Sequence, residues 1–128
     1  MESLIQQKSF AFALRIIKLY SKLQEQREYV LSRQLLRSGT SIGANVTEAT
    51  AGQSRKDFLS KMSIASKEAR ETKYWLQLLQ QSELTTLDVT PELAAVEELI
   101  RILTSIVKTT SQHREPKLKT QNSNLEIQ

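Results

Sequence analysis

Two glutamates at the spacing of metal ligands, Glu68 and Glu71, are the first residues in this sequence that suggest a chemistry. A di-metal site in a helical bundle needs carboxylates three residues from histidines, contributed by more than one helix. The sequence holds one histidine, His113, and no cysteine. Arg70 and Lys73 flank the glutamates, and ion pairing along a helix explains the spacing better than metal binding. We therefore expect no metal site.

Nucleophilic catalysis lacks its usual partners in this chain. A serine or threonine nucleophile needs a nearby base, and a phosphate-binding loop needs closely spaced glycines in a defined motif. The chain has three glycines and no such motif. We expect a protein that is not an enzyme and that uses no cofactor.

Basic side chains give a stronger signal than any catalytic motif. Residues 8–73 hold 13 Lys or Arg and six Asp or Glu, whereas residues 83–98 hold five acids and no base. This asymmetry predicts a basic face and an acidic face, although an ordinary solvated helix surface has a similar composition. The candidates for contacting nucleic-acid phosphates are Lys8, Arg15, Lys18, Lys22, Arg33, Arg37, Lys56, Lys67, Arg70 and Lys73.

Two functions remain open from this charge pattern. The first is a homo-oligomeric accessory protein that binds RNA or DNA through backbone charge, with contacts that add across protomers. The alternative is a protein–protein interaction module with an acidic protein partner.

Composition limits the chain to one helical domain outside the membrane. A chain of 128 residues fits a single domain, and three glycines with two prolines favour long helices. Its most apolar stretch, residues 10–20, is interrupted by Arg15 and Lys18, so neither a signal peptide nor a membrane span is expected. The lack of cysteine is compatible with a cytoplasmic protein.

Apolar periodicity predicts four helices, over about 3–24, 27–51, 55–81 and from Thr90 to about 111. Ser54 is placed to cap the third helix. The connections are short, and the apolar seams alternate by three and four residues. We predict an all-α fold, an up-down-up-down antiparallel four-helix bundle over residues 1–111, followed by a disordered polar tail over residues 112–128.

The first helix has two apolar stripes. Ile5, Phe12 and Ile16 belong to the stripe that we expect to face the core. A second stripe leaves only a narrow polar line, and a lone bundle cannot bury two faces of an outer helix. We therefore predict self-association, with Tyr74 of the third helix in the interface and Trp75 at the edge between the core and the oligomer contact. The predicted oligomer interface is Phe10, Ala13, Ile17, Tyr20 and Tyr74.

Small residues interrupt the second helix at Ser38, Gly39, Ser41, Gly43 and Asn45. Each glycine costs about 1 kcal/mol relative to alanine in a helix, so something must offset it. We expect close approach of a neighbouring helix at the glycines, and a polar network of Ser38 and Asn45 that fixes the helix register. A helix-turn-helix that reads DNA fits the segment poorly.

The segment Leu36–Val46, with Glu48 and Ala49 after it, resembles the four-helix-bundle proteins encoded in intervening sequences of bacterial 23S ribosomal RNA genes. Residues 54–79 resemble them too, and the similarity covers about residues 5–110. The resemblance implies a homopentameric barrel of four-helix bundles. A related branch, the accessory variability proteins of diversity-generating retroelements, binds nucleic acid and a reverse transcriptase. This sequence resembles the stand-alone members more, so the retroelement role is not carried over.

Overall fold

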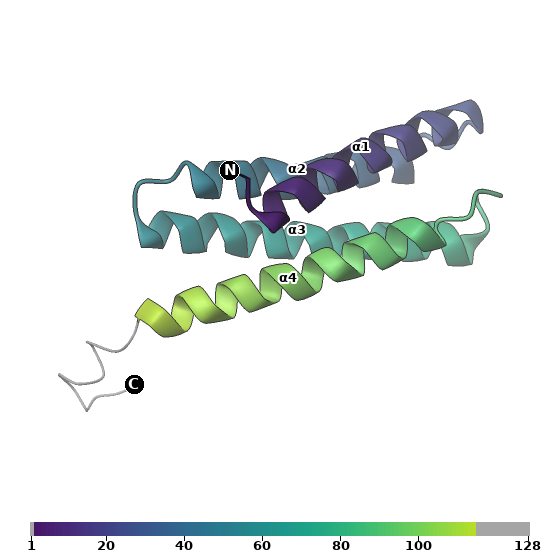
Figure 1. Cartoon of the computed structure of the whole chain (residues 1–128). Helices are drawn as coiled ribbons and strands as arrows, with labels where there is room; N and C mark the ends of the chain where they lie inside the picture. The colour runs from purple at the N-terminus through teal and green to yellow at the C-terminus, as the bar shows by residue number, and fades with distance from the viewer. Residues whose placement is uncertain (1, 115–128) are drawn as a thin grey trace.

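The described part of the chain, residues 2–114, forms four helices in which neighbours run antiparallel (Figure 1). The computed structural model describes residues 2–114, with α1 at Leu4–Glu25, α2 at Leu31–Thr50, α3 at Arg55–Ser82 and α4 at Thr90–Arg114. Each helix packs against its neighbours in the order α1, α2, α3, α4 and back to α1, so α1 lies diagonally across from α3. Figure 1 shows the connections α1–α2 and α3–α4 at one end of the bundle and α2–α3 at the other. The predicted all-α four-helix bundle is confirmed.

Local hydrogen bonds explain where the helices begin. Ser3 caps α1 in a reciprocal capping box with Gln6, and the backbone N–H of Asp57 donates to the Ser54 hydroxyl oxygen at 3.0 Å at the start of α3. α4 begins at Thr90, where the carboxylate of Asp88 accepts the Thr90 N–H at 2.9 Å. α4 ends at Arg114, three residues beyond the predicted limit of the bundle, and the rest of the predicted tail lies outside the described residues.

The start of α2 differs from the prediction by four residues. The chain leaves α1 through Arg27, which has a left-handed φ of 64°. The carboxylate of Glu28 then accepts backbone N–H groups of Val30, Leu31 and Ser32 at 3.1, 3.0 and 2.6 Å. Because Glu28 satisfies these free donors from outside the helix, α2 begins at Leu31 and not at residue 27.

The core lies along the predicted seam of α1 and the facing sides of the other helices. Ile5, Phe12 and Ile16 are all buried. From the remaining helices, the fully buried large side chains include Leu35, Ile42, Met62, Leu76, Leu79, Val96, Leu99 and Leu103. One continuous apolar core therefore holds the bundle together.

The glycines of α2 lie against α1. A Cβ atom on Gly39 would lie 3.0 Å from two side-chain carbons of the fully buried Ile16. A Cβ atom on Gly43 would lie 3.3 Å from the backbone oxygen of Ser9. Any side chain at either position would meet α1, so the glycines let the two helices pack closely.

The polar contact across the core differs from the expected one. Ser38 is fully buried, and the hydroxyl of Thr72 on α3 donates to its oxygen at 2.8 Å. The side-chain amide of Asn45 instead donates to the backbone oxygen of Ser41 in its own helix at 2.8 Å. In the described structure, Ser38 is thus bonded across the helices to Thr72 and not to Asn45. Ser41 likewise bonds within α2, donating to the Ser38 backbone oxygen at 2.9 Å.

Candidate nucleic-acid interface

The acidic residues of α4 neutralise part of the predicted basic face. Lys8 of α1 pairs with Glu98 at 3.1 Å, and Arg15 approaches Glu92 at 3.6 Å. Both glutamates belong to the acidic stretch that was expected to form a face of its own. Because α1 and α4 are neighbours, these charges compensate one another instead of separating.

Bases of α3 also have partners on α4. Lys73 pairs with Glu97 at 3.3 Å. The guanidinium of Arg70 donates to the hydroxyl oxygen of Thr104 at 3.0 Å. Neither side chain is free of internal contacts, although both lie at the protein surface.

Arg37 of α2 forms ion pairs with both glutamates that have metal-ligand spacing, Glu68 and Glu71, the first of them at 3.2 Å. The indole N–H of Trp75 donates to the Glu71 carboxylate at 3.0 Å, and this bond, followed by Arg37, lowers the pKa of Glu71. The hydrogen bond from Arg37 to Glu71 in turn raises the pKa of Arg37. Ion pairing between helices therefore accounts for these glutamates, and no cluster suited to a metal occurs among the described residues.

The side chains of five of the ten predicted phosphate-contacting residues have no ion pair or hydrogen bond with any described residue. They are Lys18, Lys22, Arg33, Lys56 and Lys67, and all five are exposed. They come from α1, α2 and α3 and represent positive charge that the described part of the chain does not compensate.

Three further cations of this kind were missed by the sequence reasoning. Arg27 lies in the turn after α1, and Arg101 and Lys108 lie on α4; all three side chains are exposed and have no partner within residues 2–114. The list of candidates ended at residue 73, so the two residues of α4 fell outside it. The helical phase of Arg101 indicates its exposure, because it lies two residues from both Leu99 and Leu103 of the buried seam, on the outward side.

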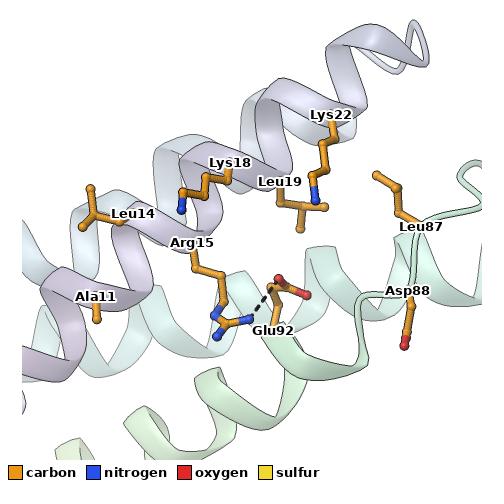
Figure 2. Close-up of a pocket in the computed structure, with 9 residues that line it drawn as sticks. All are labelled: Ala11, Leu14, Arg15, Lys18, Leu19, Lys22, Leu87, Asp88 and Glu92. Atoms are coloured by element: carbon orange, nitrogen blue, oxygen red, sulfur yellow. Dashed lines mark ion pairs between the residues drawn. The ribbon is translucent and has the colours of Figure 1, made fainter.

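A cleft opens beside Lys18 and Lys22. It has a volume of about 570 Å³ and lies between the outer face of α1, the α3–α4 connection and the first turn of α4. Figure 2 shows Arg15 of α1 and Glu92 of α4 reaching toward one another across this gap, while Asp88 points away from it. The cleft is larger than three other surface pockets of the described residues, which have volumes of about 410, 250 and 190 Å³.

The second apolar stripe of α1 is open to solvent in the single chain. Phe10 is 67% exposed and Ile17 46%, whereas Ala13 and Tyr20 are half-buried. Tyr74 is 53% exposed and stacks edge-on against Trp75 with ring centroids 5.1 Å apart. The predicted interface residues therefore form two separate surfaces, because α1 and α3 lie diagonally across the bundle. Within residues 2–114, no helix is long and apolar enough to cross a membrane.

The comparisons with known proteins agree with this architecture. A protein of unknown function from the S23 ribosomal protein family of Bacteroides thetaiotaomicron VPI-5482 has a crystal structure that matches with a TM-score of 0.78 and 48% sequence identity. The match covers 82% of this chain and 99% of that one. No curated protein matches the chain. The sequence profile of the 23S rRNA-intervening sequence proteins matches residues 1–111, and the chain belongs to this family.

Proposed function

We propose that the protein is a homo-oligomeric accessory factor that binds RNA or DNA through backbone charge. The observation that supports this proposal is a set of five exposed cations whose side chains have no partner within residues 2–114: Lys18, Lys22, Arg33, Lys56 and Lys67. Phosphate contacts by such side chains release counterions from the nucleic acid, and this release drives binding that does not depend on sequence.

Self-association would multiply this charge. The exposed Phe10 and Ile17 need a cover. Phe10 also lines a groove of about 410 Å³ between α1 and α2, together with Ala13, Gly43 and Ala44. A second copy of this chain is the cover that we propose, because helix α1 is apolar on two sides.

The arrangement of the apolar surfaces favours a ring. A two-fold dimer uses the same patch on both subunits, whereas a cyclic ring joins two different patches. Tyr74 on α3 and the stripe of α1 are two different patches, because α1 and α3 lie diagonally across the bundle and are not neighbours. We extend the proposal to a closed ring, with five subunits as the number that the family resemblance implies.

Fluorescence anisotropy with labelled RNA and DNA tests the binding proposal. The substitution of Lys18, Lys56 and Lys67 by Gln removes three unpaired charges. A matched control replaces Lys8, Lys61 and Lys73, which all pair with glutamates. Both variants lose the same net charge, so the unpaired set should lose more affinity. Each lost phosphate contact should also reduce the slope of log K against log salt by about 0.7 for a single strand.

Three results would count against the proposal. Absence of binding at about 50 mM salt would refute nucleic-acid binding altogether. Equal losses in the two triple variants would refute the role of the unpaired lysines. A partner that is retained after nuclease treatment, and lost in the unpaired triple variant, would favour the acidic-protein alternative.

The mass of the protein in solution tests self-association. Substitution of Phe10 and Ile17 by Glu should dissociate the oligomer, because two charges would have to be buried at the interface. A wild-type protein that stays a monomer at micromolar concentration would refute the ring.

A further inference from the structure

The cleft between α1 and the start of α4 has the size and lining of a small-molecule site. Its volume of about 570 Å³ lies within the range of ligand pockets. The lining combines apolar and charged side chains: Ala11, Leu14, Arg15, Lys18, Leu19, Lys22, Leu87, Asp88 and Glu92. None of these residues was singled out as a small-molecule site by its sequence pattern.

The charges in the cleft leave two lysines uncompensated. Asp88 accepts the Thr90 N–H at the start of α4, and its side chain is directed away from the gap in Figure 2. Glu92 approaches Arg15. Lys18 and Lys22 are one helical turn apart, with no partner among the described residues. Side chains at this spacing are neighbours on a helix surface, so both ammonium groups can contact one anionic group.

Glu92 presents an acceptor with no donor. Its side chain is 12% exposed, and its Oε2 atom lies 3.6 Å from Arg15. The other carboxylate oxygen, Oε1, is buried and accepts no hydrogen bond within the described residues. Buried polar atoms nearly always have a partner, so this oxygen is available to accept from a hydroxyl or amino group of a ligand, or from a water molecule that such a group would displace.

Leucines supply the apolar part of the cleft. Leu14 is 49% exposed beside it, and Leu87 of the α3–α4 connection approaches from the other side. Figure 2 shows Leu87 pointing toward the part of α1 that carries Lys22. A ligand for this cleft therefore needs an anionic group, a hydrogen-bond donor and a body with apolar surface.

We propose that this cleft binds a nucleoside monophosphate unit, either as a free nucleotide or as the terminal nucleotide of a strand. The phosphate contacts Lys18 and Lys22, a ribose hydroxyl or base amino group donates to Glu92, and the base covers Leu14 and Leu87. Inorganic phosphate would leave Glu92 and the leucines without contacts. The site shares Lys18 and Lys22 with the proposed strand-binding surface, but the contacts of a mononucleotide with Glu92, Leu14 and Leu87 do not require that the outer surface binds a strand.

Isothermal titration calorimetry on the full chain tests the site with 5′-mononucleotides, the matching nucleosides and inorganic phosphate. A mononucleotide should bind at least about tenfold more tightly than either fragment, because a charge-assisted hydrogen bond contributes roughly that factor or more. Substitution of Lys18 and Lys22 by Gln should lower the affinity for the mononucleotide by about tenfold or more and leave the affinity for the nucleoside unchanged. The control replaces Lys61 and Lys108 by Gln, the same charge change outside the cleft, and should leave binding unchanged.

The Glu92→Gln variant separates positioning of the ligand from simple charge attraction. It should lower the affinity for the mononucleotide severalfold, because the carboxylate acceptor is lost. The affinity for inorganic phosphate should stay the same or increase, because one negative charge is removed. A fall in affinity for both ligands would contradict the assigned contact. Circular dichroism of each variant shows whether it is folded, and a misfolded Glu92→Gln leaves the Lys18 and Lys22 comparison as the deciding test.

Strands with and without a 5′-phosphate identify the source of the nucleotide. A preference for the phosphorylated strand that is lost with Lys18 and Lys22 assigns the site to a strand end. Mononucleotide binding without that preference assigns it to free nucleotides. The inference is overturned if the binding of a mononucleotide, tested up to about 10 mM, and the binding of a phosphorylated strand are both independent of Lys18 and Lys22. It is also overturned if an acidic peptide binds the cleft more tightly than a mononucleotide. Loss of general strand binding would refute the proposed function and leave the mononucleotide results unaffected.

Discussion

The buried hydrogen bond between Thr72 and Ser38 should make the stability effects of these two residues strongly coupled. Both side chains are fully buried, and the single proton of the Thr72 hydroxyl has two acceptors at 2.8 Å, the Ser38 oxygen and the backbone oxygen of Glu68. Within the described residues, the Ser38 hydroxyl has one other hydrogen bond, which it donates to the backbone oxygen of Leu35 at 3.5 Å, a long distance for a hydroxyl. The two hydroxyls therefore depend on each other unequally.

This inequality sets the expected magnitudes. Thr72→Val keeps the shape of the side chain and leaves the Ser38 hydroxyl without a good partner, so it should lower the free energy of unfolding by about 2 kcal/mol. Ser38→Ala should cost only about 1 kcal/mol, because Thr72 still donates to the Glu68 backbone oxygen. In the double variant no hydroxyl remains unpaired, so the total should stay near 2 kcal/mol, a coupling of about 1 kcal/mol.

Urea unfolding of the four proteins measures this cycle. All samples need the same protein concentration, because self-association would add to the apparent stability by mass action. The unfolding slope m should be the same in all four, as expected when the change in exposed surface is constant. Additive costs within about 0.3 kcal/mol would show that the two hydroxyls do not interact, and would refute this account of the helix pairing.

Three more predictions follow from the structure. Glu28→Ala should lower the free energy of unfolding by about 1–2 kcal/mol in urea, because it removes the acceptor for three backbone N–H groups at the start of α2; an unchanged midpoint would contradict the capping. Gly39→Ala gains about 1 kcal/mol in helix propensity, but the added methyl group would press on Ile16, and such overpacking costs about 1–3 kcal/mol. The thermal midpoint should therefore fall or stay the same. A clear rise would show that α1 can move away from α2 at little cost. The pKa of Glu71 is lowered when folded, so its contribution to stability is complete above the ordinary value of 4.5 and is lost as pH falls through the lower folded pKa. In Glu71→Gln this part of the pH dependence should disappear, which the fluorescence of the single tryptophan can follow between about pH 5 and pH 2.

The sequence was most informative where a local rule decides the structure. The spacing of Ile5, Phe12 and Ile16 follows the helical period, and that period alone determines which side of α1 is buried. Ser54 precedes α3 by one residue, so its role as a cap depends on no distant contact. Both predictions are confirmed because the physics that sets them acts within one turn of the chain.

Predictions that needed a distant partner fared less well. Ser38 bonds to Thr72, 34 residues away, and no pattern within α2 indicates that partner. The expected partner, Asn45, has a backbone oxygen available four residues earlier, and such a local bond needs no helix to be placed. The basic residues were identifiable by type, but which of them are neutralised depends on which helices become neighbours.

That dependence explains why the acidic stretch does not form a face of its own. In an antiparallel bundle with α1 beside α4, Glu92 and Glu98 lie along the bases of α1. Exposed ion pairs contribute little to stability, typically up to about 1 kcal/mol, so folding gains little from this pairing. Its main effect is on the electrostatic potential at the surface. Glutamates of α4 pair with Lys8 and Arg15 but with neither Lys18 nor Lys22, which lie further along α1. Positive charge is thereby concentrated at the end of α1 beside the cleft, where an anionic ligand would meet least competition from the chain's own carboxylates.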